Sequence, residues 1–195
     1  EPCPDIRMGF FYAMTGQNRT RYDMKNIEEL AQERILILDG AMGTMIQRLG
    51  LTEQDFHPPG MEKHEIILQG NNELLSLSKP DAIRKIHEEY LEAGADIVET
   101  NTFSATTIAQ AEHKCEHLVR ELNIRSAQLA REACAKYSAL DPNRPRFVAG
   151  AIGPMNKTAS LSPDVNDPGF RAVTFDQLLT AYSEQVDALL EGDVD

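Results

Sequence analysis

Short apolar runs alternate along the chain with longer amphipathic stretches. The run 35–38 is apolar at every position and ends in Asp-Gly, which predicts a strand buried on both faces of a parallel sheet. Runs at 95–100 and 146–152 predict a second and a third strand. Apolar positions at helical spacing predict a short helix beginning near Ile27 and a long helix over about 115–138.

Two further helices have clear end signals. Ser78 and Asp81 have capping-box spacing ahead of one helix, and Gly94 is placed to end it. Thr174 and Gln177 have the same spacing ahead of the last helix. The apolar positions predicted to face the core are Ile83, Ile86, Tyr90 and Leu91 in the first helix, and Leu178, Leu179, Tyr182, Val186, Leu189 and Leu190 in the last.

The resulting order is βαβαβα, followed by Val194–Asp195 as the first step of a fourth strand. Such alternation predicts an α/β protein with a parallel sheet and right-handed crossovers. A doubly wound sheet and part of a (β/α)8 barrel both fit. A complete barrel needs about 250 residues, so this chain would hold about three of its units. Residues 1–24 carry no clear period and are predicted to be a poorly ordered tail, which leaves residues 25–195 as one domain.

Composition narrows the classes of partner. The 195 residues carry a net charge of −12, so phosphate backbones and anionic lipid surfaces would be repelled. We therefore expect neither a nucleic acid nor a membrane as a partner. Three widely spaced cysteines argue against a disulfide framework and favour a reducing, cytoplasmic location.

Polar residues follow each predicted strand, where α/β proteins bind their ligands. Asp39 could accept hydrogen bonds from a ligand ammonium, and the backbone N–H of Gly40 could hold a carboxylate. Glu99, Thr100 and Asn101 lie at the end of the second strand. The residues alone leave open whether Asp39 binds a ligand or only caps the following turn. They also leave open whether Glu99 is an acid or base or only orders neighbouring loops.

Other chemistry has weaker support in the sequence. The turn after the first strand lacks both the P-loop ending and the G-x-G-x-x-G pattern, which disfavours phosphate binding. His113 and His117 are spaced so that one helix could direct both at a metal ion. No glutamate completes an H-E-x-x-H motif, and the flanking charges favour a solvated helix end.

Taken together, four segments resemble one known family. They are Leu38-Asp39-Gly40-Ala41-Met42-Gly43-Thr44-Met45-Ile46-Gln47, Gly70-Asn71-Asn72, Ala93-Gly94-Ala95-Asp96-Ile97-Val98-Glu99-Thr100-Asn101-Thr102-Phe103 and Ser162-Pro163-Asp164-Val165. From about residue 33 to 195, the chain resembles the N-terminal homocysteine-binding domain of cobalamin-dependent methionine synthases, in the homocysteine S-methyltransferase family.

This resemblance implies a (β/α)8 TIM barrel, of which the chain would hold the first three βα units and the start of strand four. It implies an enzyme of one-carbon metabolism and methionine biosynthesis, a methyltransferase. The methyl group would pass from methylcobalamin, and ultimately from 5-methyltetrahydrofolate, to homocysteine. Asp39 would contact the homocysteine ammonium, Gly40 its carboxylate, and Thr100 the same amino-acid end, while Glu99 and Asn101 would shape the rim.

The resemblance also implies cofactors and partners outside this segment. Zinc would be held by three cysteines on later barrel strands, and folate and cobalamin by downstream modules of the same parent polypeptide. Cys115 and Cys134 match none of those ligand positions. We therefore expect a truncated fragment that binds no zinc or cobalamin and is inactive alone. The alternatives are a non-catalytic fragment or binding module, and a cobalamin-independent homocysteine S-methyltransferase.

Overall fold

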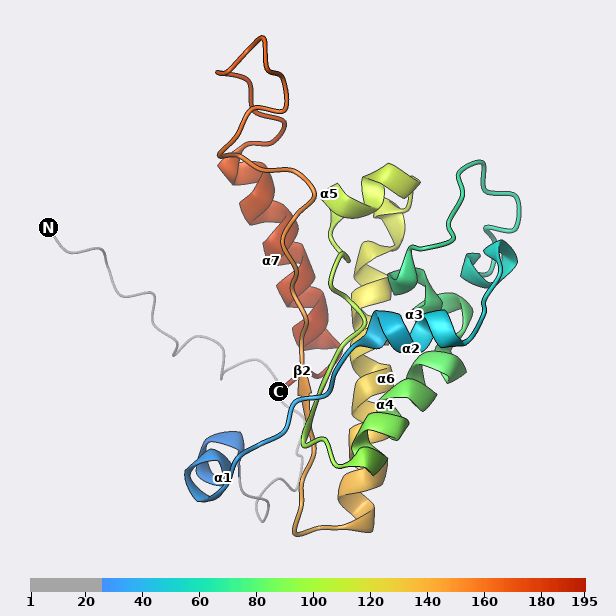
Figure 1. The fold of residues 1–195 in the computed structure, drawn as a ribbon, viewed down its shortest axis with the longest axis vertical. Coiled ribbons are helices and arrows are strands. Elements are labelled where there is room, and N and C mark those ends of the chain that lie inside the picture. Colours follow the sequence, from blue (N-terminus) through green and yellow to red (C-terminus); the bar gives the residue numbers. More distant parts are fainter. Residues whose placement is uncertain (1–25) are drawn as a thin grey trace, which may run out of the picture.

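The computed structural model describes residues 26–195, and the tail predicted over residues 1–24 lies outside the described residues. This part of the chain combines helices with a small parallel sheet (Figure 1). The α-helices are α1 (Ile27–Glu33), α2 (Met42–Arg48), α3 (Leu75–Ser78), α4 (Pro80–Ala93), α5 (Thr107–Gln110), α6 (Val119–Leu140) and α7 (Phe175–Glu191), and the strands are β1 (Ile97–Glu99) and β2 (Phe147–Ala149). The 3-10 helices are η2 (Glu53–Phe56), η3 (Asn72–Leu74), η4 (Ala111–His113) and η5 (Glu116–Leu118).

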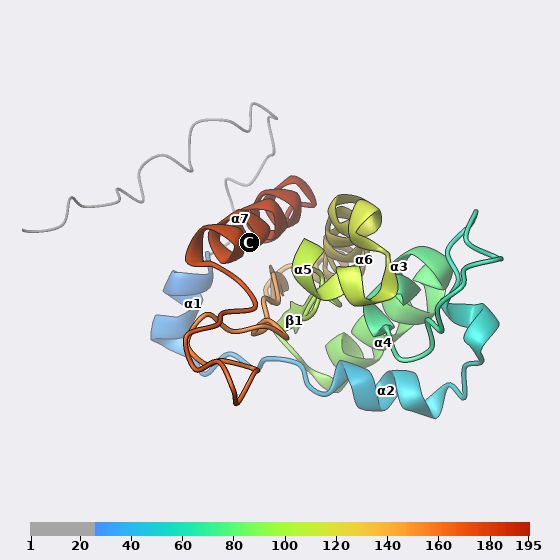
Figure 2. The ribbon, with the colours of Figure 1, turned by 90° about the horizontal axis from the view of Figure 1, so that it is seen from above.

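The sheet has β1 at its centre. β1 and β2 are parallel, with Val98 opposite Val148, and Leu38 forms a parallel bridge with Ile97 on the other edge of β1. The predicted parallel sheet is therefore confirmed in this part of the chain. Figure 2 shows the strands on the inner side of an arc formed by α4, α6 and α7.

The strands are shorter than predicted. β1 and β2 have three residues each, and the run 35–38 contributes only the Leu38 bridge. The prediction that this run is buried on both faces is wrong, because Ile35 is 89% exposed and Leu38 is 48% exposed. An apolar strand becomes buried only where a layer packs over each face, and the described residues do not supply both layers here.

The end of the described chain lies beside β2. The Asp195 N–H donates to the Val148 carbonyl at 2.9 Å, and the Val148 N–H donates to the Asp195 carboxylate at 2.9 Å. The predicted fourth strand is thus present only as a short segment that lies beside β2 and is not itself a strand.

The helix before β1 ends as predicted but begins differently. Gly94 follows α4 in the left-handed conformation, with a φ of 109°, which glycine adopts without steric cost. Ser78, however, does not cap α4, because its hydroxyl donates to the Leu74 carbonyl one turn back at 3.2 Å. Ser78 is the last residue of α3, so the hydroxyl lies inside a preceding helical turn.

The last helix begins with the predicted capping box. The Gln177 N–H donates to the Thr174 hydroxyl at 3.2 Å, and the Thr174 N–H donates to the Gln177 side chain at 2.9 Å. Its buried face is narrower than predicted, since Leu179 is 55% exposed while Ala181 and Gln185 are buried. Small residues and one glutamine therefore form much of the contact of α7 with its neighbours.

The long helix α6 begins later than predicted. The predicted helix over 115–138 is observed as Val119–Leu140, and two 3-10 turns precede it. Two apolar clusters pack against α6, one with α3 and α4 and one with β1 and β2. Leu122 and Leu129 belong to the first cluster, and Ala133 and Val148 belong to the second.

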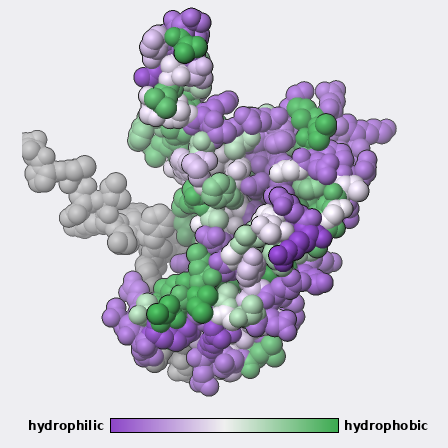
Figure 3. All heavy atoms as spheres, in the orientation of Figure 1, coloured by the Kyte–Doolittle hydropathy of each residue, from purple (hydrophilic) through white to green (hydrophobic). Residues whose placement is uncertain are grey.

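Several apolar side chains remain outside these clusters. Figure 3 shows apolar groups reaching the surface in separate patches on the face drawn. Among residues 26–195, the most exposed large apolar side chains are Val165, Ile35, Leu140, Ile67, Phe175 and Leu161. No helix in the described part of the chain is long and apolar enough to span a bilayer.

A buried carboxylate connects the segments at the amino-terminal end of the sheet. Asp96, with no exposed side-chain surface, accepts two hydrogen bonds from Arg34 at 2.7 and 2.9 Å and one from Arg144 at 2.9 Å. It also accepts the Ile37 N–H at 3.0 Å, and the guanidinium of Arg146 lies 3.8 Å away. Burial raises the pKa of Asp96, but these donors outweigh that effect and hold the pKa well below its usual range.

We expect Asp96→Asn to lower the free energy of unfolding at neutral pH by about 3–5 kcal/mol, because it leaves partly buried guanidinium groups without their counter-charge. Urea denaturation measures this loss. Asp81→Asn is the matched control, since Asp81 is 86% exposed and pairs with Arg84 at 2.6 Å, an arrangement that contributes less than about 1 kcal/mol. Equal effects of the two substitutions would contradict the role given to Asp96.

A buried histidine in α4, unlike Asp96, lacks hydrogen-bond partners in the described part of the chain. His87 is fully buried, and neither ring nitrogen has a hydrogen-bond partner among residues 26–195. Burial lowers its pKa to about 4 from an ordinary 6.5. Between these values the unfolded chain binds more protons than the folded chain, so His87 makes stability rise with pH from about 4 to 6.5.

We therefore expect His87→Leu to stabilise the chain by about 2 kcal/mol more at pH 5 than at pH 8. Urea denaturation of both proteins at the two pH values gives this difference. Any change in packing contributes equally at both pH values and cancels. A pH-independent effect of the substitution would show that His87 does not remain neutral in the folded chain.

Candidate functional site

A pocket of about 520 Å³ lies at the carboxyl-terminal ends of the strands. Its wall combines residues from the turn into α2, the end of β1 and the segment after it, the start of η3 and the segment after β2. The lining residues are Asp39, Gly40, Ala41, Met42, Gly43, Gly70, Asn72, Glu73, Glu99, Thr100, Asn101, Thr102, Phe103, Ser104 and Ala151. We call this the strand-end pocket.

The strand-end pocket contains all five residues that the sequence predicted for a ligand site. Asp39 and Gly40 come from one side, and Glu99, Thr100 and Asn101 come from the end of β1. The fold brings the two groups together because Leu38 bridges to β1 just before Asp39. Their proximity is a property of the structure, while their roles toward a ligand stay predictions.

Asp39 has the most unusual electrostatics in the pocket. The Glu99 N–H donates to both of its carboxylate oxygens at 3.1 Å, and its own N–H donates to the Ile97 carbonyl at 2.9 Å. Burial raises the pKa of Asp39 to about 7; the Glu99 N–H opposes this rise, and the Glu99 negative charge adds to it. A cationic ligand group beside Asp39 would favour the ionised carboxylate.

The hydroxyl of Thr100 belongs to a closed set of hydrogen bonds. It accepts the Ala151 N–H at 2.9 Å and lies 2.6 Å from the Thr102 hydroxyl, which donates to the Ala151 carbonyl at 2.8 Å. Since the Thr102 proton goes to that carbonyl, the Thr100 proton goes to Thr102. Thr100 can therefore only accept a hydrogen bond from a ligand, which suits an ammonium group and not a carboxylate.

Asn101 connects the segment after β1 to η3 and α3. Its amide donates to the Asn72 carbonyl at 2.7 Å and to the Ser76 hydroxyl at 3.3 Å. The Ser126 hydroxyl of α6 lies 2.7 Å from that of Ser76. Asn101 is only 6% exposed, so its side chain shapes the rim through the protein itself.

Gly40 leaves its backbone N–H available. Within residues 26–195 this N–H makes no hydrogen bond, as the predicted contact with a ligand carboxylate requires. The absence of a side chain is less critical, because a Cβ at Gly40 would meet the Tyr90 hydroxyl at an ordinary 3.4 Å.

Sequence reasoning missed a third carboxylate in the pocket. Glu73 is 9% exposed and accepts the Ser104 N–H at 2.9 Å. Burial raises its pKa, opposed by its own N–H, by the Ser104 N–H and by nearby His113. Glu73 directly follows Gly70-Asn71-Asn72, so its position in a long loop beside a quoted motif was the available signal.

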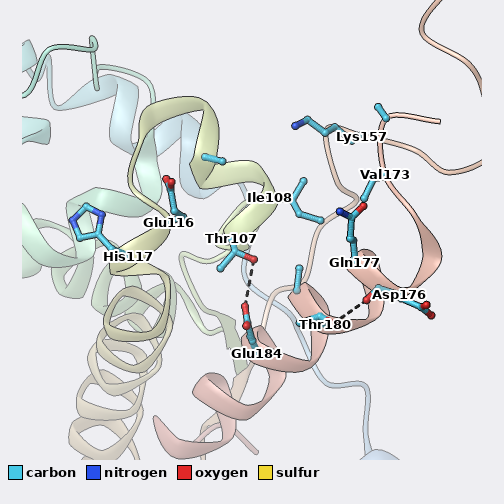
Figure 4. A pocket seen from close by; sticks show the side chains of 13 residues that line it. Thr107, Ile108, Glu116, His117, Lys157, Val173, Asp176, Gln177, Thr180 and Glu184 are labelled. Atoms are coloured by element: carbon cyan, nitrogen blue, oxygen red, sulfur yellow. Dashed lines mark hydrogen bonds between the residues drawn. The ribbon is translucent and has the colours of Figure 1, made fainter. Parts of the chain in front are cut away.

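A second and larger pocket, about 700 Å³, lies between α5 and α7 (Figure 4). Thr107 and Glu184 face each other across it at 3.3 Å, and Lys157 and Gln177 stand at its other end. None of the five residues predicted to bind the amino-acid ligand lines it. The strand-end pocket is the better candidate, because it lies at the carboxyl-terminal end of a parallel sheet, where α/β proteins bind their ligands, and contains the unpaired Gly40 N–H.

The metal arrangement considered for His113 and His117 does not form. Lys114 has a φ of 53° and separates two 3-10 turns, so the two histidines do not share a helix face. No group of three or more His, Cys, Asp or Glu within residues 26–195 could hold a metal ion. The thiols of Cys115 and Cys134 are buried and donate to backbone carbonyls.

Residues 36–195 are similar in sequence and structure to homocysteine methyltransferases. The homocysteine S-methyltransferase family model matches residues 36–195. The metallated form of the homocysteine methyltransferase MmuM from Escherichia coli is 26% identical, with a TM-score of 0.62 over 85% of this chain and 54% of MmuM. Its oxidized form is also 26% identical, with a TM-score of 0.64 over 88% of this chain and 55% of MmuM. The chain therefore spans about half the length of these solved proteins.

The pKa of Asp39 leads to a test of its environment. The folded chain holds the Asp39 proton up to about pH 7 and the unfolded chain only to about 3.8, so stability falls as the pH rises between these values. We expect Asp39→Asn to be more stable than the parent chain above pH 7, by roughly 1–4 kcal/mol, with the difference vanishing toward pH 4.

Thermal or urea denaturation at pH 4 and pH 8 measures the effect of Asp39→Asn. Asp187→Asn, an exposed position on α7, is the control and should leave the pH dependence unchanged. If Asp39→Asn has no pH-dependent effect, the Asp39 carboxylate is not held in an unfavourable environment.

Proposed function

Because the chain belongs to the homocysteine S-methyltransferase family, we propose that it binds homocysteine in the strand-end pocket as part of a methyltransferase. The ionised Asp39 carboxylate accepts hydrogen bonds from the ligand ammonium, and Thr100 accepts another. The Gly40 N–H binds the ligand carboxylate. Glu99 adds negative charge at the rim, and Asn101 holds the rim together.

One observation carries this proposal. The strand-end pocket places a half-buried carboxylate next to an unpaired backbone N–H. These two groups match the two charges of an α-amino acid. The similarity to the MmuM structures, which are homocysteine methyltransferases by name, supports homocysteine as that amino acid.

The proposal extends to the parent fold. The parallel order of Leu38, β1 and β2, with Asp195 next to β2, is that expected for the first strands of a (β/α)8 TIM barrel. In this proposal residues 25–195 form the first three βα units and the start of strand four. The exposure of Ile35 and Leu38 is then the exposure of a barrel strand whose covering layers are incomplete.

The methyl donor is part of the proposal as well. The resemblance to cobalamin-dependent methionine synthases supports methylcobalamin as the donor, recharged from 5-methyltetrahydrofolate by downstream folate and cobalamin modules. The similarity to MmuM supports a second candidate, a cobalamin-independent homocysteine S-methyltransferase with another donor. A non-catalytic homocysteine-binding fragment is the third. Cys115 and Cys134 are free and buried, which supports a cytoplasmic location for all three candidates.

The described residues do not fit a zinc ion. Cys115 and Cys134 lie apart, and each thiol donates to a backbone carbonyl, that of His113 and that of Phe147. Burial raises the pKa of Cys134 to about 12, which disfavours the thiolate that zinc binds. In this proposal, zinc and cobalamin bind to other parts of a longer parent protein. Residues 26–195 bind the amino-acid end of the substrate.

Binding of homocysteine under reducing conditions tests the proposal. Calorimetry or ligand-observed NMR should detect binding to the 195-residue chain at pH 8. Asp39→Asn should weaken it by about 10- to 150-fold, because a hydrogen bond to a charged group is lost. Asp187→Asn should bind like the parent chain.

Stability measurements separate ligand binding from folding. Asp39→Asn should bind homocysteine more weakly while its stability above pH 7 increases. Undetectable binding by the parent chain would reject the proposed function. Equal affinities of Asp39→Asn and Asp187→Asn would reject the role of Asp39.

A further inference from the structure

One aromatic side chain stands out of a buried segment at the pocket. Phe103 is 57% exposed, although Thr100, Asn101, Thr102 and the following Ala105 are all nearly or fully buried. Phe103 also lines the strand-end pocket. Burial of a large aromatic ring is favourable, and the Phe103 ring forgoes part of this free energy beside a polar pocket. In that position it can contact a bound ligand.

Three hydrogen bonds fix the backbone around Phe103. The Gln185 side chain of α7 donates to the Thr102 carbonyl at 2.7 Å. The Gly153 N–H donates to the Phe103 carbonyl at 3.0 Å, and the Ser104 N–H donates to Glu73 at 2.9 Å. Consecutive residues are thereby held from three different elements, which preorganises the backbone that carries the ring.

The Phe103 ring packs directly against Gly153. A Cβ at Gly153 would lie 2.5 Å from the Phe103 carbonyl oxygen and 2.7 and 2.8 Å from two ring carbons. Only glycine therefore allows the observed position of the ring and backbone together. Gly153 is itself held by Tyr182, whose hydroxyl donates to the Gly153 carbonyl at 3.1 Å.

The pocket thus has a charged part and an apolar part. Asp39, Glu99 and the Gly40 N–H supply the charged part, whereas Phe103 and Ala151 supply apolar surface. We propose that Phe103, seated on Gly153, contacts the sulfur-bearing side chain of the bound amino acid and sets the preference for sulfur at that end. Sulfur makes favourable contacts with aromatic rings, which oxygen or a methyl group does not reproduce.

This inference rests on the proposed function and is tested with three ligands. Homocysteine has the thiol, homoserine has a hydroxyl in its place, and 2-aminobutyrate ends one atom earlier. The parent chain should bind homocysteine more tightly than either analogue. Phe103→Ala should weaken homocysteine binding by about three- to tenfold and bring the three affinities close together.

Two further variants make the test specific. Gly153→Ala should lower the same selectivity, because the added Cβ displaces the ring. Phe170→Ala removes a phenylalanine that is 47% exposed and does not line the pocket, and it should retain the parent selectivity. Circular dichroism shows whether Phe103→Ala folds. If it does not, NMR titration of the parent chain replaces it. The Phe103 ring resonances should then shift more with homocysteine than with 2-aminobutyrate.

The outcomes distinguish this inference from the proposed function. If the parent chain binds none of the three ligands, the proposed function fails, and this inference fails with it. If the parent chain binds them and Phe103→Ala leaves the selectivity unchanged or weakens all three equally, the inference alone is overturned. Loss of selectivity in Phe103→Ala and Gly153→Ala, but not in Phe170→Ala, supports it.

Discussion

The arrangement of the sheet depends on the buried carboxylate of Asp96. This carboxylate accepts hydrogen bonds from Arg34 and Ile37, which precede the Leu38 bridge, and from Arg144, which precedes β2. One side chain therefore aligns three segments at the amino-terminal end of the sheet. Strands rise about 3.3 Å per residue, so the alignment is carried through the three residues of β1 to Glu99 and the strand-end pocket, roughly 10 Å away.

The opposite end of the sheet uses its polar groups in a different way. Hydrogen bonds within the protein occupy Thr100, Thr102 and Asn101, which gives the rim its shape. Asp39, in contrast, is partly buried beside Glu99 with no cationic partner in the part of the chain that the structure describes, and burial raises its pKa to about 7. The two ends thus differ in their electrostatics, since guanidinium groups compensate the charge of Asp96 and no cationic side chain among residues 26–195 compensates that of Asp39.

The family to which the chain belongs, the homocysteine S-methyltransferases, indicates which amino acid to propose as the ligand of the strand-end pocket. In the proposed function, the described residues contact the ammonium, the carboxylate and the side chain of the amino acid, and they include no group of three or more His, Cys, Asp or Glu that could hold a metal ion. A free thiol has a pKa near 8.5 and is mostly protonated at neutral pH. The proposed function therefore assigns recognition of the substrate to the described residues and activation of its sulfur to another part of the parent enzyme.

Local sequence determined much of the fold. The Thr174–Gln177 capping box, the end of α4 at Gly94 and the parallel sheet were all predictable, because caps and apolar periods act over a few residues. The candidate site was predictable for a related reason. Asp39 and Glu99 each follow an apolar run, and the ends of parallel strands meet at one edge of a sheet.

Only the tertiary structure decided which of these surfaces became covered and which polar groups became paired. Apolar periodicity marks residues 35–38 as able to be buried, but burial needs partners from elsewhere, and Ile35 remains exposed. The contacts Arg34–Asp96, Glu73–Ser104 and Phe103–Gly153 join residues that are far apart along the chain. No local pattern encodes such pairs, because they depend on the order and spacing with which whole elements pack together.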